Sequence, residues 1–308
     1  ITAGAGLVVN ENLAVTGGAL QLSNASGNFD VGFGAIISND GSNLIQIDSA
    51  GLIVMTDTGT QITSSGDGTI DLDAAVHVLL TNVNTSGEVQ VTAAGGQIFD
   101  NTAAEAAVIT ADRVALRAAT GIGAAGAGDI DLAVGTIAAD TTAGDIYLSQ
   151  LGLLEVDTVD GLVGITAGGN IDLNVGAMNT YQDIEATGAA STISVLNAGD
   201  LSIGAGVITN GGQIDILSNN NLFLTGSSLV DTTTAAIVNV IANADSIGSG
   251  SIHQSDGGLV NSHGGYLTVE GLLVNISDLR SVGGTVAVTA TGLSIIDNSI
   301  GGELPLIT

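Results

Sequence analysis

Short stretches of alternating apolar and polar residues recur along the whole chain. In residues 211–226, Ile214-Asp215-Ile216 and Leu222-Phe223-Leu224 are two such stretches, separated by small polar residues. A period of two indicates a β-strand, because successive side chains point to opposite faces. Glycine or asparagine before most stretches allows a tight turn. The other main stretches are residues 20–22, 45–47, 70–72, 89–91, 114–116, 130–132, 146–148, 171–173, 201–203, 267–269 and 286–288.

The spacing of these stretches predicts a repeat architecture. Within residues 20–173, successive stretches begin roughly 16 to 26 residues apart and on average near 20, which is the period range of solenoid repeats. A strand of three or four residues is not stable alone. We therefore expect an all-β protein, a parallel β-helix with coils of about 20 residues whose apolar pairs stack as internal ladders. The alanine-rich segment 103–116 ends in a strand-like stretch, so no helix is expected.

An antiparallel sandwich is the rival fold. It requires turns every 8–12 residues and longer strands that carry aromatic side chains. Aromatic residues make up only 2% of this chain, and the apolar residues are mainly Ala, Val, Ile and Leu. The short strands and the thin side chains favour the β-helix.

The sequences at the two ends of the chain suggest that the terminal coils pair with further coils or with other subunits. We expect one β-helix domain over residues 1–308, in which the terminal coils 1–17 and 296–308 are short, apolar and without a cap. Uncapped coils expose unpaired backbone and apolar core. Either the chain is a segment of a longer β-helix, or its ends join other subunits by stacking or strand addition. The residues expected at such joins are Leu7, Val8, Val9, Leu304, Leu306 and Ile307.

Charge excludes several classes of partner. The chain has 31 acidic and three basic residues, no lysine, and a net charge of −28. Such a chain repels phosphate backbones and anionic membrane surfaces, so nucleic-acid binding is not expected. No apolar run approaches the ~18 residues that a membrane span needs, so membrane insertion is not expected either. The absence of cysteine excludes a disulfide framework and thiolate metal sites.

Aspartates occupy two kinds of position. Asp71, Asp131, Asp172 and Asp215 each lie between two apolar residues and are expected to face outward. Equal charges on adjacent coils would repel at ~4.8 Å. Because uncharged residues such as Gln90 fall between them, we expect the chain to space its acidic side chains.

The second group lies in turns. Asp129, Asp145 and Asp200 directly precede strands, where aspartate bonds locally to the backbone. Calcium prefers oxygen ligands from turns, so these three are our candidate calcium ligands. The Gly-Gly-x-Gly-x-Asp calcium repeat does not occur. We expect no other cofactor.

The sequence contains few residue patterns that indicate catalysis. Enzymes that act on polysaccharides need paired carboxylates, or calcium with a basic residue, and usually aromatic platforms. The aromatic residues here are scattered, and Arg280 with Asp278 reads as a surface ion pair. His253 and His263 lie ten residues apart, with Asp256 between them, and are expected to be turn residues. We therefore expect that the protein is not an enzyme.

Three Asn-x-Ser sequons occur, at Asn24, Asn84 and Asn275. They are candidate glycosylation sites. In a chain rich in Asn, Ser and Thr, chance accounts for them equally well.

The repeat resembles that of a known family. The Gly-x-(Ile/Leu)-x-(Leu/Ile) stretches, with turns such as Ala198-Gly199-Asp200 and Thr209-Asn210-Gly211-Gly212, are similar to the repeat region of filamentous-haemagglutinin-like exoproteins. These are two-partner-secretion adhesins of bacterial surfaces. The Asn-Pro-Asn-Gly-like motifs of that family's secretion domain are not found. The resemblance implies an extracellular, right-handed β-helix used in adhesion or in building a matrix such as a biofilm.

These observations together predict an extracellular or cell-surface structural protein. It would form a stiff fibre, sheath or surface filament by end-to-end self-association, with an acidic exterior for solubility and for cation cross-linking. The alternative is an adhesin stalk or binding module that recognises a surface glycan or a receptor. The third hypothesis, a polysaccharide-degrading enzyme, has the least support.

Overall fold

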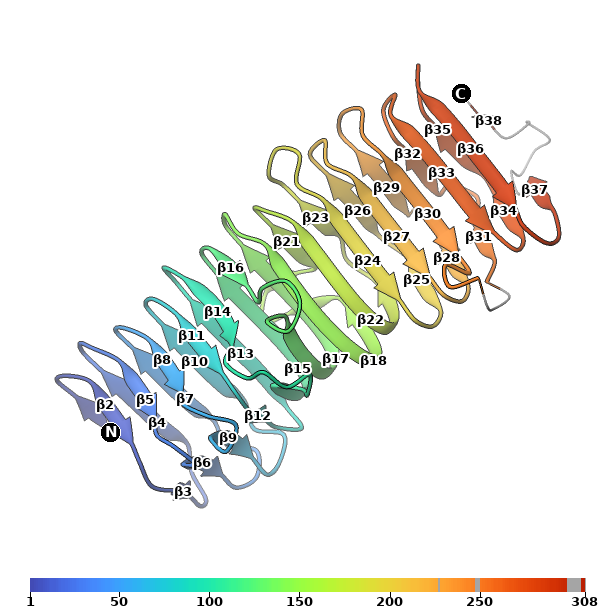
Figure 1. Ribbon diagram of the computed structural model, residues 1–308. Coiled ribbons are helices and arrows are strands. Elements are labelled where there is room, and N and C mark those ends of the chain that lie inside the picture. Colours follow the sequence, from blue (N-terminus) through green and yellow to red (C-terminus); the bar gives the residue numbers. More distant parts are fainter. Residues whose placement is uncertain (227, 247–249, 298–305, 308) are drawn as a thin grey trace. The chain divides into compact units, whose positions relative to one another are not determined.

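The computed structural model describes residues 1–226, 228–246, 250–297 and 306–307 (Figure 1). The predicted parallel β-helix is confirmed: parallel strands form a β-solenoid of about 13 turns with about 23 residues each. The described residues contain no helix, and segment 103–116 runs into a strand as expected. Coils are longer than the predicted 20 residues because most of them hold three strands, and the alternating pattern had marked mainly one of the three.

The chain forms two compact units. The first contains Ile1–Gln150 and Thr158–Leu162, and the second contains Leu151–Asp157 and Val163–Thr308. Each unit is a three-sided stack of parallel strands. The expectation of one domain over 1–308 concerns the relation between these units and stays a prediction.

Three ladders of parallel strands build the first unit. The first ladder consists of β1 (Thr2–Ala3), β4 (Leu20–Asn24), β7 (Ile45–Ser49), β10 (Ile70–Ala74), β13 (Glu88–Ala93) and the second halves of β15 (Ile109–Ala118) and β17 (Ile130–Thr141). The second consists of β2 (Leu7–Val9), β5 (Phe29–Val31), β8 (Ile53–Met55), β11 (Val78–Leu80), β14 (Gln97–Asp100), β16 (Gly121–Ile122) and the start of β18 (Ile146–Val156). The third consists of β3 (Leu13–Val15), β6 (Ile36–Asn39), β9 (Gln61–Ser64), β12 (Val83–Asn84) and the first halves of β15 and β17.

The second unit repeats this arrangement. One ladder consists of β21 (Ile165–Ala167), β23 (Ile184–Ala186), β26 (Gly206–Thr209), β29 (Leu229–Thr232), β32 (Leu259–Asn261), β35 (Asp278–Arg280) and β38 (Leu306–Ile307). The next consists of the first half of β22 (Ile171–Thr180), β24 (Ile193–Asn197), β27 (Ile214–Ser218), β30 (Val238–Ala242), β33 (Tyr266–Gly271) and β36 (Thr285–Ala290). The last consists of the second half of β22, β25 (Leu201–Ile203), β28 (Leu222–Leu224), β31 (Ile252–Gln254), β34 (Val274–Ile276) and β37 (Ile295–Asp297).

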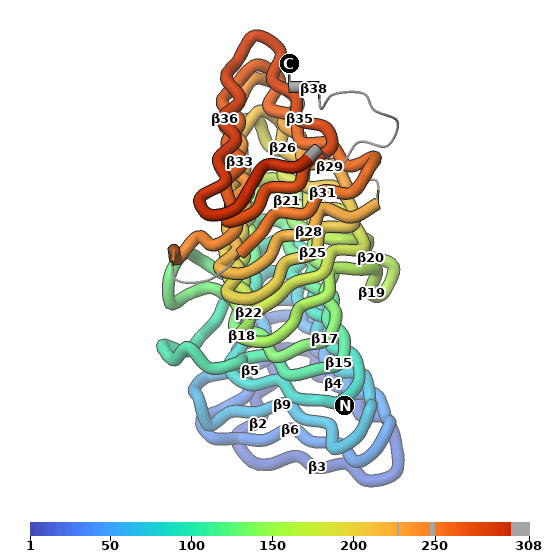
Figure 2. Tube along the Cα trace, turned by 90° about the vertical axis from the view of Figure 1, so that its right-hand side faces the viewer, coloured from blue at the N-terminus to red at the C-terminus, as the bar shows by residue number. Residues whose placement is uncertain are grey.

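Two short strands lie outside these ladders. β19 (Thr158–Val159) and β20 (Leu162–Val163) form a separate two-stranded sheet. Figure 2 shows this hairpin on the outside of the coils.

The core follows directly from the alternating pattern. Ile70 pairs in register with Ile45, and Leu72 pairs with Ile47. All four side chains are fully buried, because the apolar members of each strand point inward and stack on those of the next coil. Burying one such side chain contributes about 1.5–3 kcal/mol, so the stacked rows supply most of the stability of each unit.

Polar side chains close the corners between strands. A buried or partly buried hydroxyl at the end of a strand donates to the carbonyl oxygen three residues later and so satisfies the backbone of the turn. The residues that do this are Ser49, Thr141, Thr209, Ser218 and Ser262.

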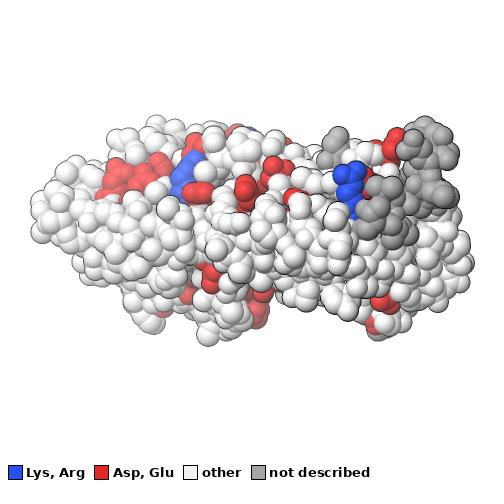
Figure 3. All heavy atoms as spheres, turned by 90° about the horizontal axis from the view of Figure 1, so that it is seen from above, with Lys and Arg blue, Asp and Glu red and all other residues white. Residues whose placement is uncertain are grey.

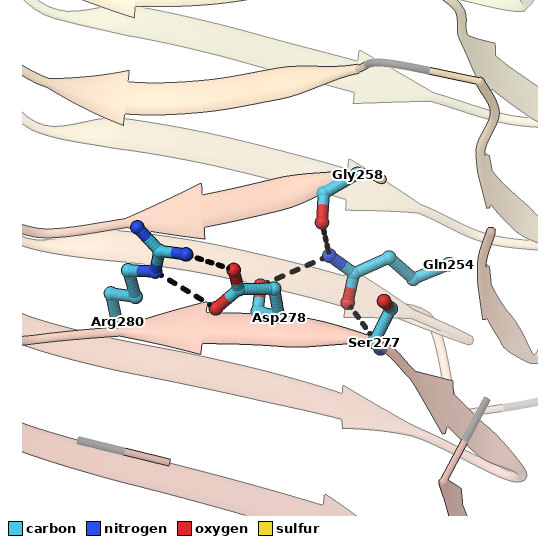
Figure 4. Close-up of polar contacts among 5 residues, drawn as sticks. All are labelled: Gln254, Gly258, Ser277, Asp278 and Arg280. Carbon is cyan, nitrogen blue, oxygen red and sulfur yellow. Dashed lines mark hydrogen bonds and ion pairs between the residues drawn. The ribbon is translucent and has the colours of Figure 1, made fainter. Parts of the chain in front are cut away.

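Gln254 performs a similar task in the second unit (Figure 4). Its side chain is 1% exposed. The amide nitrogen donates to the carbonyl oxygens of Gly258 (2.7 Å) and Asp278 (3.0 Å), and the amide oxygen accepts from the backbone N–H of Ser277 (3.0 Å). One side chain thus joins β31 to the next coil.

Candidate functional site

Three carboxylates meet on the outside of the first unit. Glu105 lies in the connection between β14 and β15, Asp129 directly precedes β17, and Asp131 is the second residue of β17. One oxygen from each side chain lies within 4.8 Å of the others. The backbone of the connection runs alongside Asp131, because the N–H of Val108 donates to the Asp131 carbonyl oxygen at 2.9 Å. We call Glu105, Asp129 and Asp131 the acidic cluster.

The charges of the acidic cluster are poorly compensated. Burial, and then the nearby charges of Asp131 and Glu105, raise the pKa of Asp129. The Oδ1 atom of Asp129 is buried and has no hydrogen-bond partner, whereas the Ser149 hydroxyl donates to Asp131. Asp131 is 7% exposed. Carboxylates this close repel one another unless a proton or a cation is shared between them.

The donor atoms of the acidic cluster fit a hard divalent cation. Calcium takes six to eight oxygen ligands, so three carboxylates would have to be completed by backbone carbonyls or water. The sequence singled out Asp129 as a calcium candidate and placed Asp131 correctly on a strand. It missed Glu105, because this residue lies in a connection that carries no repeat pattern.

The other two calcium candidates lie elsewhere. Asp145, in the first unit, accepts a hydrogen bond from the Tyr147 hydroxyl at 3.2 Å. Asp200, in the second unit, accepts two bonds of 3.1 Å from the backbone and side-chain nitrogens of Asn221. Asp200 therefore caps a corner of the next coil, and within the described part of the chain neither residue belongs to a group of three potential metal ligands.

Two aspartates occupy neighbouring positions on the outer face of the first ladder. Asp48 and Asp73 are register partners on adjacent coils. The expectation that acidic side chains are spaced apart is wrong for this pair. Asp71, in contrast, is flanked by Gln46 and Gln90, as predicted.

Burial and the two neighbouring aspartates raise the pKa of Asp71. Burial raises the pKa of its carboxyl group to about 6, with further contributions from the charges of Asp73 and Asp48. Arg117 acts in the opposite direction. Figure 3 shows one face of the molecule, on which acidic side chains gather in patches and basic ones are few. The expected single row through Asp71 and Asp131 does not form, because Asp131 belongs to the third ladder.

The β19–β20 hairpin is fastened to the first unit by two of the three arginines. Arg113 donates to the carbonyl oxygen of Thr158 at 2.6 Å. Arg117 donates to the carbonyl oxygen of Asp160 and lies 2.8 Å from its carboxylate. The guanidinium groups therefore hold the hairpin at β19 and at the turn that follows it.

An apolar contact lies under the hairpin. Ala115 and Ala138 occupy adjacent positions on the outer face of β15 and β17. Both are fully buried in a small cluster with Val159 and Leu162. Alanine at these outward positions lets the hairpin approach the sheet, and the repeat pattern gave no sign of this packing.

The two histidines differ in position: His263 lies in a turn as expected, whereas His253 lies in β31, so the expectation of a turn is wrong for His253. His253 stacks on Phe223 with ring centroids 5.3 Å apart and an interplanar angle of 14°. The Nε2 atom of His263 lies 3.0 Å from the Asp231 carboxylate. Neither histidine is grouped with Asp256 in a set of potential metal ligands among the described residues. Arg280 pairs with Asp278, as predicted for a surface ion pair.

The sequons differ in accessibility. Asn24 is 6% exposed, and its side-chain nitrogen donates to the carbonyl oxygens of Ser26 and Gly27. Asn84 is exposed in β12, and Asn275 is half-buried in β34. Glycosylation of these asparagines stays a prediction.

The residues expected at joins lie mostly in terminal strands. Leu7, Val8 and Val9 form β2, and Leu306 and Ile307 form β38. Leu304 lies outside the described residues. Their part in self-association stays a prediction.

Comparison of the chain with protein-family models, with curated proteins and with solved structures gives no significant match. Among the described residues, no helix is long and apolar enough to cross a membrane.

Proposed function

We propose that the protein is a structural β-solenoid of a cell surface or extracellular matrix, whose coils build a fibre or sheath by self-association. The observation that carries this proposal is the continuous hydrogen bonding of three parallel ladders in each unit around a core that is mainly aliphatic. Such ladders resist bending and unravelling because each coil is bonded to its neighbours along its whole length.

The terminal strands support self-association. Leu7 donates to the Asn28 carbonyl oxygen, and Val9 accepts from Gly32. Because alternate residues of a parallel strand bond to opposite sides, the N–H and C=O groups of Val8 point to the free edge of β2. Val8 is 53% exposed. A free edge of this kind pairs readily with a strand of another copy.

Electron microscopy of the purified protein at increasing concentration tests the proposal. We expect filaments for the wild type and their loss in Val8→Pro, which removes the edge N–H without touching the bonds to β5. Val8→Thr, which keeps that N–H, is the matched control and should still assemble. Isolated particles at every concentration, with or without calcium, would contradict the fibre proposal.

An adhesin stalk is the alternative, because the same solenoid can carry a ligand site. It differs from the fibre in needing a binding surface on the outer face and no contact between ends. Filament formation and ligand binding are separate measurements, so they distinguish the two functions.

A further inference from the structure

One strand in the second ladder of the first unit, β16, has no outward side chains. β16 pairs with β14 through Gln97–Gly121 and Ile98–Ile122, and Ile122 pairs in turn with Ile146 of β18. The outward positions beside Ile122 are Gly121 and Gly123. The sheet therefore has a gap one coil wide, between the side chains of β14 and those of β18.

Both glycines are required at this gap. Gly121 and Gly123 have φ angles of 153° and 69°, which other residues rarely adopt. A Cβ atom on Gly121 would lie 2.7 Å from Nε2 of Gln97, and one on Gly123 would lie 2.6 Å from the Tyr147 carbonyl oxygen. Both glycines are buried. The end of the Gln97 side chain lies over Gly121, and the backbone of residues 129–130 approaches the place of a Gly123 Cβ atom to 3.1–3.2 Å.

The walls of the gap are polar and aromatic. The cavity has a volume of about 470 Å³, and its lining includes Gln97, Thr120, Ala125, Asp145 and Tyr147. That volume falls within the roughly 300–1,000 Å³ of small-molecule sites. The loop that follows β16 supplies one wall, and it is closed by a 2.7 Å bond from the Ala124 N–H to the Gly128 carbonyl oxygen. The site is therefore built from bonded backbone.

We propose that this cavity binds a neutral saccharide. A sugar ring offers an apolar C–H face for the Tyr147 ring and hydroxyl groups for the Asp145 carboxylate and the Gln97 amide. The net charge of −28, with a carboxylate in the wall, disfavours acidic sugars. The chain has only seven aromatic residues, three Tyr and four Phe, and one of them, Tyr147, lines this cavity.

The inference does not depend on the fibre proposal. A solenoid that forms filaments and one that stays single both present this outer face of the first unit. Glycoside binding and filament formation are read out separately, so one can fail while the other holds.

Saturation-transfer NMR and calorimetry with neutral methyl glycosides test the inference. The probes are the methyl glycosides of glucose, galactose, mannose and N-acetylglucosamine. We expect at least one to bind with a Kd of about 1 mM or below. Tyr147→Ala and Gln97→Ala should each weaken that binding by about tenfold or more. Ala125→Phe should block it from the exposed loop while leaving every polar group in place.

Two controls keep the test decisive. Tyr266→Ala removes a tyrosine that is 60% exposed in the second unit and should leave binding unchanged. Circular dichroism shows which variants are folded, and Ala125→Phe carries the test if Tyr147→Ala does not fold. The inference is overturned if no glycoside binds the wild type, if indole binds and the glycosides do not, or if folded cavity variants bind as well as the wild type.

Discussion

The guanidinium group of Arg117 lies 2.8 Å from the carboxylate of Asp160, which follows it by 43 residues in the chain. This ion pair, with the Arg113 bond to Thr158, fastens the β19–β20 hairpin over Ala115 and Ala138 of the first unit. In a molecule with only three basic residues, two of them serve this single contact. The outer face of the first unit is therefore covered by an attached hairpin at this one place.

Removing Arg117 should release the hairpin. Arg117→Ala loses a partly exposed ion pair and a charged hydrogen bond to backbone, so we expect a destabilisation of about 1–2 kcal/mol. Amide hydrogen exchange should rise in residues 158–163. Arg280→Ala, which removes a surface pair within one strand, is the control and should cost less than about 1 kcal/mol. Unchanged exchange in the hairpin of Arg117→Ala would show that apolar packing alone holds it.

The raised pKa of Asp71 predicts a specific pH dependence. Its carboxyl group has a pKa of about 6 when folded, against ~3.9 in an unfolded chain. The folded state therefore binds more protons between these values, and the free energy of unfolding falls as pH rises through this window. After allowing for partial exposure, the contribution is about 1–2 kcal/mol.

Asp71→Asn should raise the free energy of unfolding at pH 7 and change it little at pH 4. Denaturant unfolding at the two pH values measures this difference. Asp57→Asn is an informative control, because the Thr60 hydroxyl and backbone N–H groups lower the pKa of Asp57. That variant should lose stability at pH 7. Equal stability of Asp71→Asn and wild type at both pH values would contradict the burial argument.

The acidic cluster gives opposite expectations with and without calcium. In a chelator, Asp129→Asn should raise the melting temperature, because it removes a half-buried charge whose pKa is raised by burial and by Asp131. If calcium binds, ten times its Kd stabilises the wild type by about 1.4 kcal/mol. The variant should lose most of that gain, whereas Asp200→Asn in the second unit should keep it. A wild-type melting temperature that does not respond to calcium would show that the cluster is not a calcium site.

Gln254 should be among the most sensitive polar residues of the second unit. Gln254→Ala removes three hydrogen bonds and leaves the backbone groups of Ser277, Gly258 and Asp278 without this partner. Unsatisfied buried groups cost about 1–3 kcal/mol each when water cannot replace the partner, so a loss of about 2–4 kcal/mol is expected. Gln213→Ala, which loses only a surface contact with Asp215, should change little. Thermal unfolding of both variants checks the contrast.

Only some residues of the candidate sites could be predicted from the local sequence pattern. Asp129 could be selected from its place before a strand, because turn chemistry is local. Glu105 could not, since only the path of the connection between β14 and β15 brings it to Asp129. The cavity lined by Gln97, Gly123 and Tyr147 depends in the same way on which strands become neighbours.

By itself, the sequence determined the strands, their inward faces and the solenoid, because alternation and period are properties of neighbouring residues and each coil repeats the same burial. Tertiary structure decided the register. It placed Asp48 beside Asp73, brought a distant hairpin over Ala115, and set two glycines between Gln97 and Tyr147. Contacts between coils depend on the length of every connection, and these lengths vary along the chain, so pairing across coils is settled only when the whole stack packs.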